Sequence, residues 1–339
     1  MTPAPQIAVP VTEPTQVGEA RRVAVRLAES LGFDERLRGE VAIVATELAA
    51  NLARYARDGV LLIQGLDLPA GRSLELLSID AGPGMADVSA CLRDGYSTGG
   101  TPGNGLGAVR RLSTDFDIHS TPAGTVIVSR IRPAAAAAAV AGATAWDWAA
   151  ISRPAPHELV CGDAWRIALR DEGVAVMVCD GLGHGPLAAE AAARAVAAFD
   201  ALPFEDAAVT IERSHRALTG SRGAAMAVAT LAGGRLRYAG AGNISGVITG
   251  GERGRGLPSQ NGTVGVQIRR VQALDYDWPA GARLFMHSDG LTNRWTLDSY
   301  PGLGARHPAV QAGVLWRDCT RGRDDATIVV VGRRTAGHA

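Results

Sequence analysis

The chain has 339 residues, of which 47% are hydrophobic, and a formal net charge of +0. This length predicts two domains, and the neutral balance excludes a bulk attraction to nucleic acid or to an anionic membrane surface. All 34 basic residues are Arg, so the chain has no phosphate-loop Lys, no Lys of the eukaryotic-kinase type and no Lys for Schiff-base chemistry.

The N-terminal sequence has no basic segment followed by an apolar one, and no apolar run reaches the length of a membrane span. The four cysteines are scattered and form no CxxC pair, which is typical of thiols in a reducing compartment. We therefore expect a cytoplasmic protein that binds neither membrane nor nucleic acid.

In chain order, an apolar stripe at 17–31 predicts a first helix, and a second helix follows Asp34, its expected N-cap, and ends near residue 55. Strands are expected at 60–66 and 74–79, a short helix at 108–112, and a hairpin of strands at 116–120 and 125–131. These elements predict an α/β domain over residues 1–132.

An Ala-rich segment of low charge follows, and we interpret residues 133–151 as a linker between domains. Trp146 and Trp148 lie at its end and are candidates for packing on a domain surface, so part of the linker is a candidate for ordered structure.

The rest of the chain, 152–339, is rich in strands. They are expected at 158–169, 174–179, 224–231, 236–239, 245–249, 271–276, 283–287 and 326–332. Two predicted helices, 186–199 and 205–218, interrupt them. Strands around a helix pair predict an α/β sandwich, so the whole chain is expected to be a two-domain α+β protein.

The first candidate site combines a helix with glycine-rich turns. Glu47 and Asn51 are four residues apart and share a helix face, where a carboxylate can accept a proton and an amide oxygen can bind Mg²⁺. Asp80 follows a strand in the turn DAGPG, and a second glycine cluster, 99–107, precedes a helix, where backbone N–H groups can bind phosphate. Each feature alone is common, but this order of all three is not.

This order resembles the GHKL ATPase superfamily, which has a Bergerat-type α/β sandwich. The phrases ELAANLARYARDG, DAGPGMAD, LRDGYSTGG and GNGLGAVRRLSTDFDI resemble the RsbT branch of the anti-sigma kinases, over roughly residues 11–132. The resemblance implies a serine/threonine kinase that uses ATP with Mg²⁺ and acts on STAS-domain proteins. It implies these roles: general base for Glu47, Mg²⁺ ligand for Asn51, adenine recognition for Asp80 with Gly82 and Gly84, and phosphate contacts for Gly103, Gly105 and Gly107. Thr125, in the Gly-Thr pair that ends the motif order, is a further cofactor-binding candidate.

The second candidate site is acidic. Asp163, Asp180, Asp289 and the pair Asp324-Asp325 all lie in or beside apolar strands. Like-charged carboxylates brought together need cations to offset their repulsion, and oxygen ligands favour Mg²⁺ or Mn²⁺ over zinc. An isolated turn aspartate is common, but this repeated placement predicts a metal centre.

The motifs GDAWRI, DGLGHGPLAAEAA, GAAMAVATL, AGAGNI, HSDGLT and RDDATIVVV resemble the SpoIIE/RsbX branch of the PPM-type phosphatases, over about 152–334. The resemblance implies two Mn²⁺ or Mg²⁺ ions and removal of phosphate from phosphoserine or phosphothreonine. It implies these positions: Asp180 as bridging ligand, the Gly181 carbonyl as a further ligand, Asp289 and Asp324 at the second ion, and Asp163 in support. Asp325 is the alternative to Asp324, His184 is a weaker candidate for a general acid, and His287 is interpreted as structural.

The combined expectation is a bifunctional regulator of a partner-switching, stressosome-like pathway that controls a sigma factor. Its expected partner is a STAS-domain protein, with a sigma-factor regulator or a downstream phosphatase as a further candidate. The alternative is an ATP-sensing binding module that clamps a STAS protein or sigma factor, or that governs the attached phosphatase without transferring phosphate.

Overall fold

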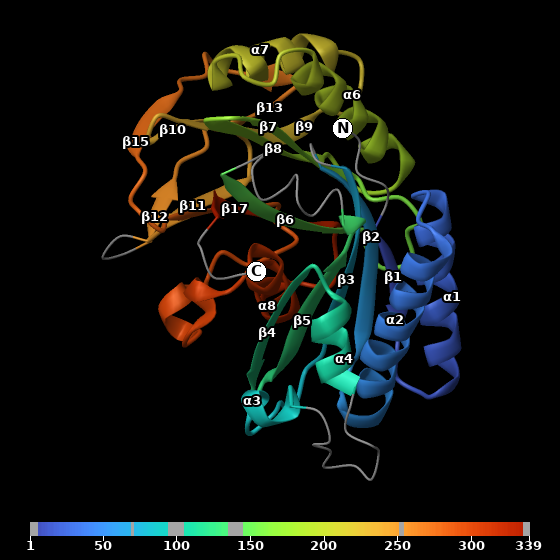
Figure 1. The fold of residues 1–339 in the computed structure, drawn as a ribbon. Coiled ribbons are helices and arrows are strands. Elements are labelled where there is room, and N and C mark those ends of the chain that lie inside the picture. The colour runs from blue at the N-terminus through green and yellow to red at the C-terminus, as the bar shows by residue number, and fades with distance from the viewer. Residues whose placement is uncertain (1–5, 69–70, 94–104, 135–144, 251–253, 335–339) are drawn as a thin grey trace. The chain divides into compact units, whose positions relative to one another are not determined.

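The computed structural model describes residues 6–68, 71–93, 105–134, 145–250 and 254–334. The chain forms two compact units. The N-terminal unit combines the described part of 3–143 with 305–317, and the C-terminal unit combines the described parts of 144–304 and 318–335. Each unit has its own sheets and helices (Figure 1), which confirms the predicted two-domain α+β class. The limits at 132 and 152 stay a prediction.

The N-terminal unit is built on one antiparallel sheet in the order β1-β2-β3-β5-β4. Its strands are β1 (Ile7–Pro10), β2 (Val60–Leu68), β3 (Gly71–Ile79), β4 (Asp115–Thr121) and β5 (Gly124–Ile131). The described helices of residues 3–143 are α1 (Thr15–Ser30), α2 (Glu35–Tyr55), α3 (Val88–Cys91) and α4 (Gly105–Leu112). In Figure 1, α1, α2 and α4 lie along one face of this sheet.

Helix α2 forms where the sequence predicts it. The carboxylate of Asp34 accepts a hydrogen bond from the N–H of Leu37 at 2.8 Å and so caps the first turn. The predicted apolar stripe is buried and consists of Leu37, Val41, Val44, Leu48 and Leu52. It belongs to one core cluster with alternate residues of β2 and β3, namely Leu61, Ile63, Leu74 and Leu76.

The other face of this sheet is covered by a helix from far along the sequence. Helix α8 (Pro308–Cys319) contributes its residues up to 317 to the N-terminal unit. A Cβ placed on Gly313 would lie 2.7 Å from Cγ1 of Val126 and 3.6 Å from the side chains of Ile79 and Leu77. At the start of α8, the N–H of His307 donates to the Asp117 carboxylate on β4 at 2.6 Å. Sequence analysis predicted no helix here.

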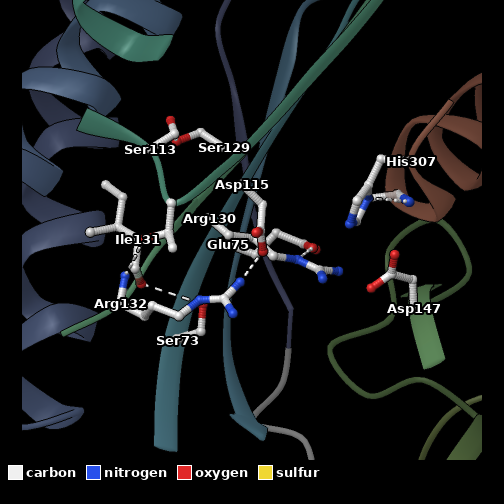
Figure 2. Close-up of polar contacts among 12 residues, drawn as sticks. Ser73, Glu75, Ser113, Asp115, Ser129, Arg130, Ile131, Arg132, Asp147 and His307 are labelled. Carbon is white, nitrogen blue, oxygen red and sulfur yellow. Dashed lines mark hydrogen bonds and ion pairs between the residues drawn. The ribbon is translucent and has the colours of Figure 1, made fainter. Parts of the chain in front are cut away.

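An ion pair is buried in the middle of the same sheet, as Figure 2 shows. Glu75 faces Gln64 on one neighbouring strand and Arg130 on the other. Its two carboxylate oxygens accept hydrogen bonds from Gln64 Nε2 at 2.6 Å and Arg130 Nε at 2.7 Å. All three side chains are almost fully buried, so both carboxylate oxygens have partners inside the protein.

The C-terminal unit contains two five-stranded sheets, in the orders β15-β10-β9-β8-β7 and β12-β11-β16-β17-β6. The first consists of β7 (Asp163–Arg170), β8 (Gly173–Gly181), β9 (Ala224–Ala232), β10 (Arg235–Ala241) and β15 (Leu274–Asp277). The second consists of β6 (Trp146–Arg153), β11 (Ser245–Thr249), β12 (Arg255–Leu257), β16 (Arg283–His287) and β17 (Ala326–Arg333). The unit also contains a short strand pair, β13 (Gly262–Thr263) and β14 (Gln267–Ile268), and two 3-10 turns, η1 (Leu297–Ser299) and η2 (Leu303–Ala305).

The predicted helix pair is present as α6 (Pro186–Ala201) and α7 (Ala207–Ala217). Ala191, Ala195 and Phe199 of α6 share a core cluster with Met177 and Cys179 of β8, so these helices cover the β8 sheet. The two sheets meet through Trp148 of β6 and Trp165 of β7, whose ring centroids are 5.6 Å apart. The unit is therefore the expected sandwich.

Two segments differ from expectation. Residues 146–151 of the predicted linker belong to β6, because this strand pairs along its whole length with β17 and buries Trp146 and Trp148. Linker residues 135–144 lie outside the described residues. The strand predicted at 158–169 begins only at Asp163, because the N–H of Gly162 donates to the Asp325 carboxylate and not to a neighbouring strand.

No helix in the described part of the chain is long and apolar enough to cross a membrane.

Candidate nucleotide site and candidate metal centre

The first site begins on α2. Glu47 and Asn51 lie one turn apart there and are partly buried. A Cβ placed on Gly105, the first residue of α4, would lie 2.6 Å from Oε2 of Glu47. Any side chain at 105 would therefore displace the carboxylate that the sequence predicts to be the general base.

Asp80 is fixed at the end of β3. Its Oδ1 accepts hydrogen bonds from the N–H of Gly82 at 2.8 Å and of Thr125 at 3.2 Å. Burial raises the pKa of Asp80, while these two N–H donors and the nearby Arg317 guanidinium oppose the rise. The carboxylate is thus held in one orientation by its own turn and by the neighbouring strand.

The turn after Asp80 depends on glycine. Gly84 has φ +77°, and a Cβ there would overlap the backbone carbonyl of Thr121. The N–H of Ala81 donates to the carbonyl of Arg57 at 2.9 Å, which ties this turn to the residues just after α2. The structure therefore holds the Asp80 turn close to the C-terminal end of the helix that carries Glu47 and Asn51.

The predicted phosphate-binding residues are described only in part. Gly103 lies outside the described residues, as does most of the cluster 99–107. Gly105 and Gly107 lie in the first turn of α4, and the Oγ1 of Thr125 is 2.8 Å from the Oγ of Ser120.

One residue at this site lies outside every sequence motif. Arg317 of α8 donates from Nη1 to the backbone carbonyl of Asp80 at 3.1 Å. No motif indicates this contact, because Arg317 follows Asp80 by more than two hundred residues and lies inside the predicted phosphatase sequence.

The second site is at one end of the β7–β8 pair. Asp163, at the start of β7, lies directly opposite Asp180, near the end of β8. Asp163 is buried, and its Oδ2 accepts a hydrogen bond from the Ser288 hydroxyl at 2.6 Å. Its Oδ1 is buried without a hydrogen-bond partner within the described residues, which is costly for a carboxylate unless a cation is bound.

The carboxylates repel one another. Burial, followed by the charges of Asp163, Asp289 and Asp324, raises the pKa of Asp180 to about 9. Burial also raises the pKa of Asp163 to about 7, against the hydrogen bonds from Ser288 and Thr327. Four predicted ligands are therefore close enough to interact, as expected for a cation site.

The pair Asp324-Asp325 divides between two environments. Both oxygens of Asp325 accept backbone hydrogen bonds, Oδ1 from Ala155 at 2.8 Å and Oδ2 from Gly162 at 2.9 Å. Asp324 is exposed at the end of the loop before β17. This geometry favours Asp324 as the ligand, because the Asp325 carboxylate is already engaged in holding the loop.

The turn that carries Asp289 is fixed from two sides. Asn243 donates from Nδ2 to Oδ2 of Asp289 at 2.7 Å, a contact that the motif AGAGNI contains but that sequence analysis did not assign. The Nδ1 of His287 donates to the carbonyl of Ser288 at 2.8 Å, and burial lowers the pKa of His287. These contacts give His287 a structural environment.

These residues fit a hard divalent cation by their chemistry. The candidate side-chain ligands are all oxygen donors, one of them a buried oxygen without a partner. As the side chains stand, no group of three or more His, Cys, Asp or Glu among the described residues is arranged to hold a metal ion. Gly181 follows Asp180, and a Cβ on it would overlap the carbonyl of Ala188, so the backbone there stays close to α6.

Known proteins resemble the chain in two separate regions. A family model described as a histidine kinase-like ATPase domain matches residues 11–131, and the model for stage II sporulation protein E (SpoIIE) matches residues 170–334. Serine/threonine-protein kinase RsbT of Bacillus subtilis (strain 168) is 33% identical over 101 residues, which are 30% of this chain and 76% of RsbT.

One solved structure has the same fold over about half of this chain. A chain from a structure of the bacterial stressosome, described as a modular system adapted to control secondary messenger signalling, has 24% identity and a TM-score of 0.51. The match covers 55% of this chain and 99% of that one. RsbX in complex with magnesium has 20% identity and a TM-score of 0.49 over 56% of this chain and 96% of its own.

Proposed function

Because the chain belongs to the RsbT family of serine/threonine kinases in its first domain and carries a SpoIIE-type phosphatase domain in its second, we propose that it is a bifunctional signalling regulator. The N-terminal site transfers phosphate from ATP to a STAS-domain partner, and the C-terminal site removes phosphate from phosphoserine or phosphothreonine. The setting is a cytoplasmic partner-switching pathway that controls a sigma factor, in which a sigma-factor regulator or a downstream phosphatase is a further partner.

In the kinase half, the carboxylate of Asp80 accepts the exocyclic amine of adenine, and Asn51 holds the Mg²⁺ that accompanies ATP. Glu47 takes the proton from the partner's serine or threonine hydroxyl as its oxygen attacks the γ-phosphorus and ADP leaves. The support for this role is the position of the Glu47 carboxylate against the first residue of α4, where phosphate-binding N–H groups begin.

In the phosphatase half, Asp180 would be the shared ligand of two Mn²⁺ or Mg²⁺ ions, and the Gly181 carbonyl, Asp289 and Asp324 would be further ligands. Asp163 supports the centre through its bond to Ser288. When bound, such ions activate water for attack on phosphorus and stabilise the charge that develops on the phosphate oxygens. The observation that carries the proposal is the position of Asp163 directly opposite Asp180, with a buried Asp163 oxygen that has no hydrogen-bond partner among the described residues. A bound cation would compensate both carboxylates.

The two halves are tested separately in the full chain. Labelled ATP with Mg²⁺ is expected to label a purified STAS-domain protein, and Glu47→Ala should lower the rate about 10²–10⁴-fold. Turnover of p-nitrophenyl phosphate should require Mn²⁺ or Mg²⁺ and should be lost in Asp180→Asn. Labelling that is unchanged in Glu47→Ala, or turnover that persists with a chelator, would reject the respective half.

One contact favours a second function, in which the N-terminal site acts as an ATP sensor for the phosphatase. The contact is the hydrogen bond from Arg317 to the Asp80 carbonyl. In the sequence, Arg317 lies between the proposed ligands Asp289 and Asp324, and its helix ends in a segment bound to the Asp289 turn. There the N–H of Thr292 donates to the carbonyl of Cys319, and the N–H of Arg321 donates to the carbonyl of Gly290.

This second function predicts that ATP changes p-nitrophenyl phosphate turnover even in Glu47→Ala, which is expected to transfer phosphate about 10²–10⁴-fold more slowly. Arg317→Ala should remove that response to ATP. Equal turnover with and without ATP at saturating Mn²⁺ would leave the kinase as the sole role of the N-terminal site.

A further inference from the structure

Large apolar side chains are exposed in four segments near the acidic centre. Leu159 is 98% exposed, and four others are between 44% and 62% exposed: Val160, Leu182, Leu187 and Val266. These five residues are called the apolar rim below. Leaving such side chains in water has a cost, and exposed apolar groups that gather in one place mark interaction sites.

The first part of the rim is held together by the loop before β7. The Oε1 of Glu158 is 2.5 Å from Nδ1 of His184, and a Cβ on Gly185 would lie 2.9 Å from Oε2 of Glu158. A Cβ on Gly162 would lie 2.7 Å from Cβ of Ala188. The segment 158–162, which carries Leu159 and Val160, therefore runs beside 184–188, which carries Leu187.

The second part is joined to the first through the turn after Asp180. The N–H of Leu182 donates to the carbonyl of Gly223 at 2.9 Å. A Cβ on Gly223 would lie 2.8 Å from Cγ2 of Val266. Leu182 is two residues from the proposed bridging ligand Asp180, so the rim borders the acidic centre and continues from Leu182 to Val266.

A cation lies within this rim. A Cβ on Gly183 would lie 2.9 Å from Nη1 of Arg222, and the Arg222 side chain is exposed. Its guanidinium has neither a hydrogen bond nor an ion pair in the described part of the chain. A free guanidinium beside an acidic metal centre is complementary to a phosphate dianion.

We propose that the apolar rim is the docking surface for a folded phosphoprotein whose phosphorylated residue is surrounded by apolar side chains. This inference rests on the proposed phosphatase function. Arg222 favours this occupant over a purely apolar partner, because it places a positive charge inside the apolar surface. Protein–protein interfaces commonly have an apolar core, and Arg is enriched among their contact residues.

The test compares a protein substrate with a small one. The variants Leu159→Ser and Leu187→Ser, singly and together, are assayed in the full chain with Mn²⁺ on a phosphoserine STAS-domain protein and on p-nitrophenyl phosphate. For the double variant, kcat/KM on the phosphoprotein should fall about tenfold or more, mainly through KM, relative to its change on p-nitrophenyl phosphate. The controls Val209→Ser and Leu274→Ser replace apolar side chains on α7 and β15 that are 40% and 41% exposed, against 53% for Leu187, and they should change kcat/KM on neither substrate.

The outcomes distinguish failure of the docking surface from failure of the proposed phosphatase function. A parallel loss on both substrates, or unchanged kcat/KM on both, would overturn the docking surface while leaving the phosphatase intact. Wild-type chain that turns over neither substrate would instead reject the phosphatase. In that case the docking surface is still tested by calorimetry, where the double variant should bind the phosphoprotein about tenfold more weakly. A change in oligomeric mass without a change in phosphoprotein affinity would assign the rim to a second copy of the chain.

Discussion

At the scale of single residues, Glu75 and Arg130 form a buried ion pair in the N-terminal sheet, in which each charge offsets the cost of burying the other. Burying two charges costs more than one hydrogen bond returns, so the pair is tolerated only because each partner neutralises the other. Gln64 completes the set by donating to the second carboxylate oxygen. Sequence analysis did not find this pair, because Glu75 and Arg130 are single polar residues in otherwise apolar strands.

Removing one partner should therefore be costly. Glu75→Leu removes the carboxylate that compensates the buried charge of Arg130 and should lower the free energy of unfolding by about 3–5 kcal/mol, measured by urea denaturation. Adding Arg130→Met should recover much of the loss. The exposed pair Arg235–Asp277 is the control, and Asp277→Leu should cost less than about 1 kcal/mol. Equal effects at both sites would contradict this interpretation.

Asp80 should matter for nucleotide affinity. An amide can turn its NH₂ toward the adenine amine, so Asp80→Asn in the full chain should weaken ATP binding by about 1.5–3 kcal/mol in calorimetry. Asp87→Asn is a suitable control, since Asp87 caps the short helix α3 through Ala90. Unchanged affinity in Asp80→Asn would remove Asp80 from the nucleotide site.

The acidic centre makes stability without metal depend on pH. The folded-state pKa values of Asp163 and Asp180 are raised from 3.8 to about 7 and about 9, so the unfolded chain ionises first. Unfolding then releases protons, so stability in chelator should be highest below the unfolded pKa of 3.8 and should fall as pH rises through about 7 to about 9. Mn²⁺ should reverse much of this fall, because it binds the ionised carboxylates. A Tm that does not change with pH in chelator would contradict the clustering.

At the scale of elements, regular periodicity explains what could be predicted. The apolar stripe of α2 buries one face of the helix, and the apolar runs of β5, β8 and β17 are buried almost throughout. The predicted helix pair and most predicted strands are present. Helix α8 has no such signal, because almost all of its residues are buried and no polar face alternates with an apolar one. Its packing against β3 and β5 is a long-range contact that no local pattern encodes.

The close contact at Gly313 tests the position of α8. A larger side chain there meets Val126, so Gly313→Leu should destabilise the chain by about 1–3 kcal/mol in urea denaturation. Gly39→Leu on α2 is the matched control, because no atom lies within 4 Å of its Cβ position. A helix position in open solvent gains from losing glycine, so this control should be neutral or slightly stabilising. If Gly39→Leu destabilised the chain more than Gly313→Leu does, the position of α8 against β3 and β5 would be wrong.

At the scale of the whole molecule, the sequence motifs indicate the candidate residues of the two sites, whereas the domain limits are predicted from composition alone. The proposed ligands of the metal centre lie in short motifs next to strand ends, so the sequence indicates which carboxylates are candidates for one site. Arg317, Asn243 and Arg222 could not be assigned in this way, because their roles depend on which loops the fold brings together. Since 305–317 belongs to the N-terminal unit, both activities are best measured in the full chain.

The most direct test of the bifunctional assignment is the steady-state phosphorylation of one STAS-domain partner incubated with ATP, Mg²⁺ and Mn²⁺. Asp180→Asn should leave the partner more highly phosphorylated than the wild-type chain does, because phosphate is added but not removed. Glu47→Ala should leave it unphosphorylated and should strip phosphate from a partner phosphorylated beforehand. Equal phosphorylation with the wild-type chain and both variants would contradict the presence of two opposed activities on this chain.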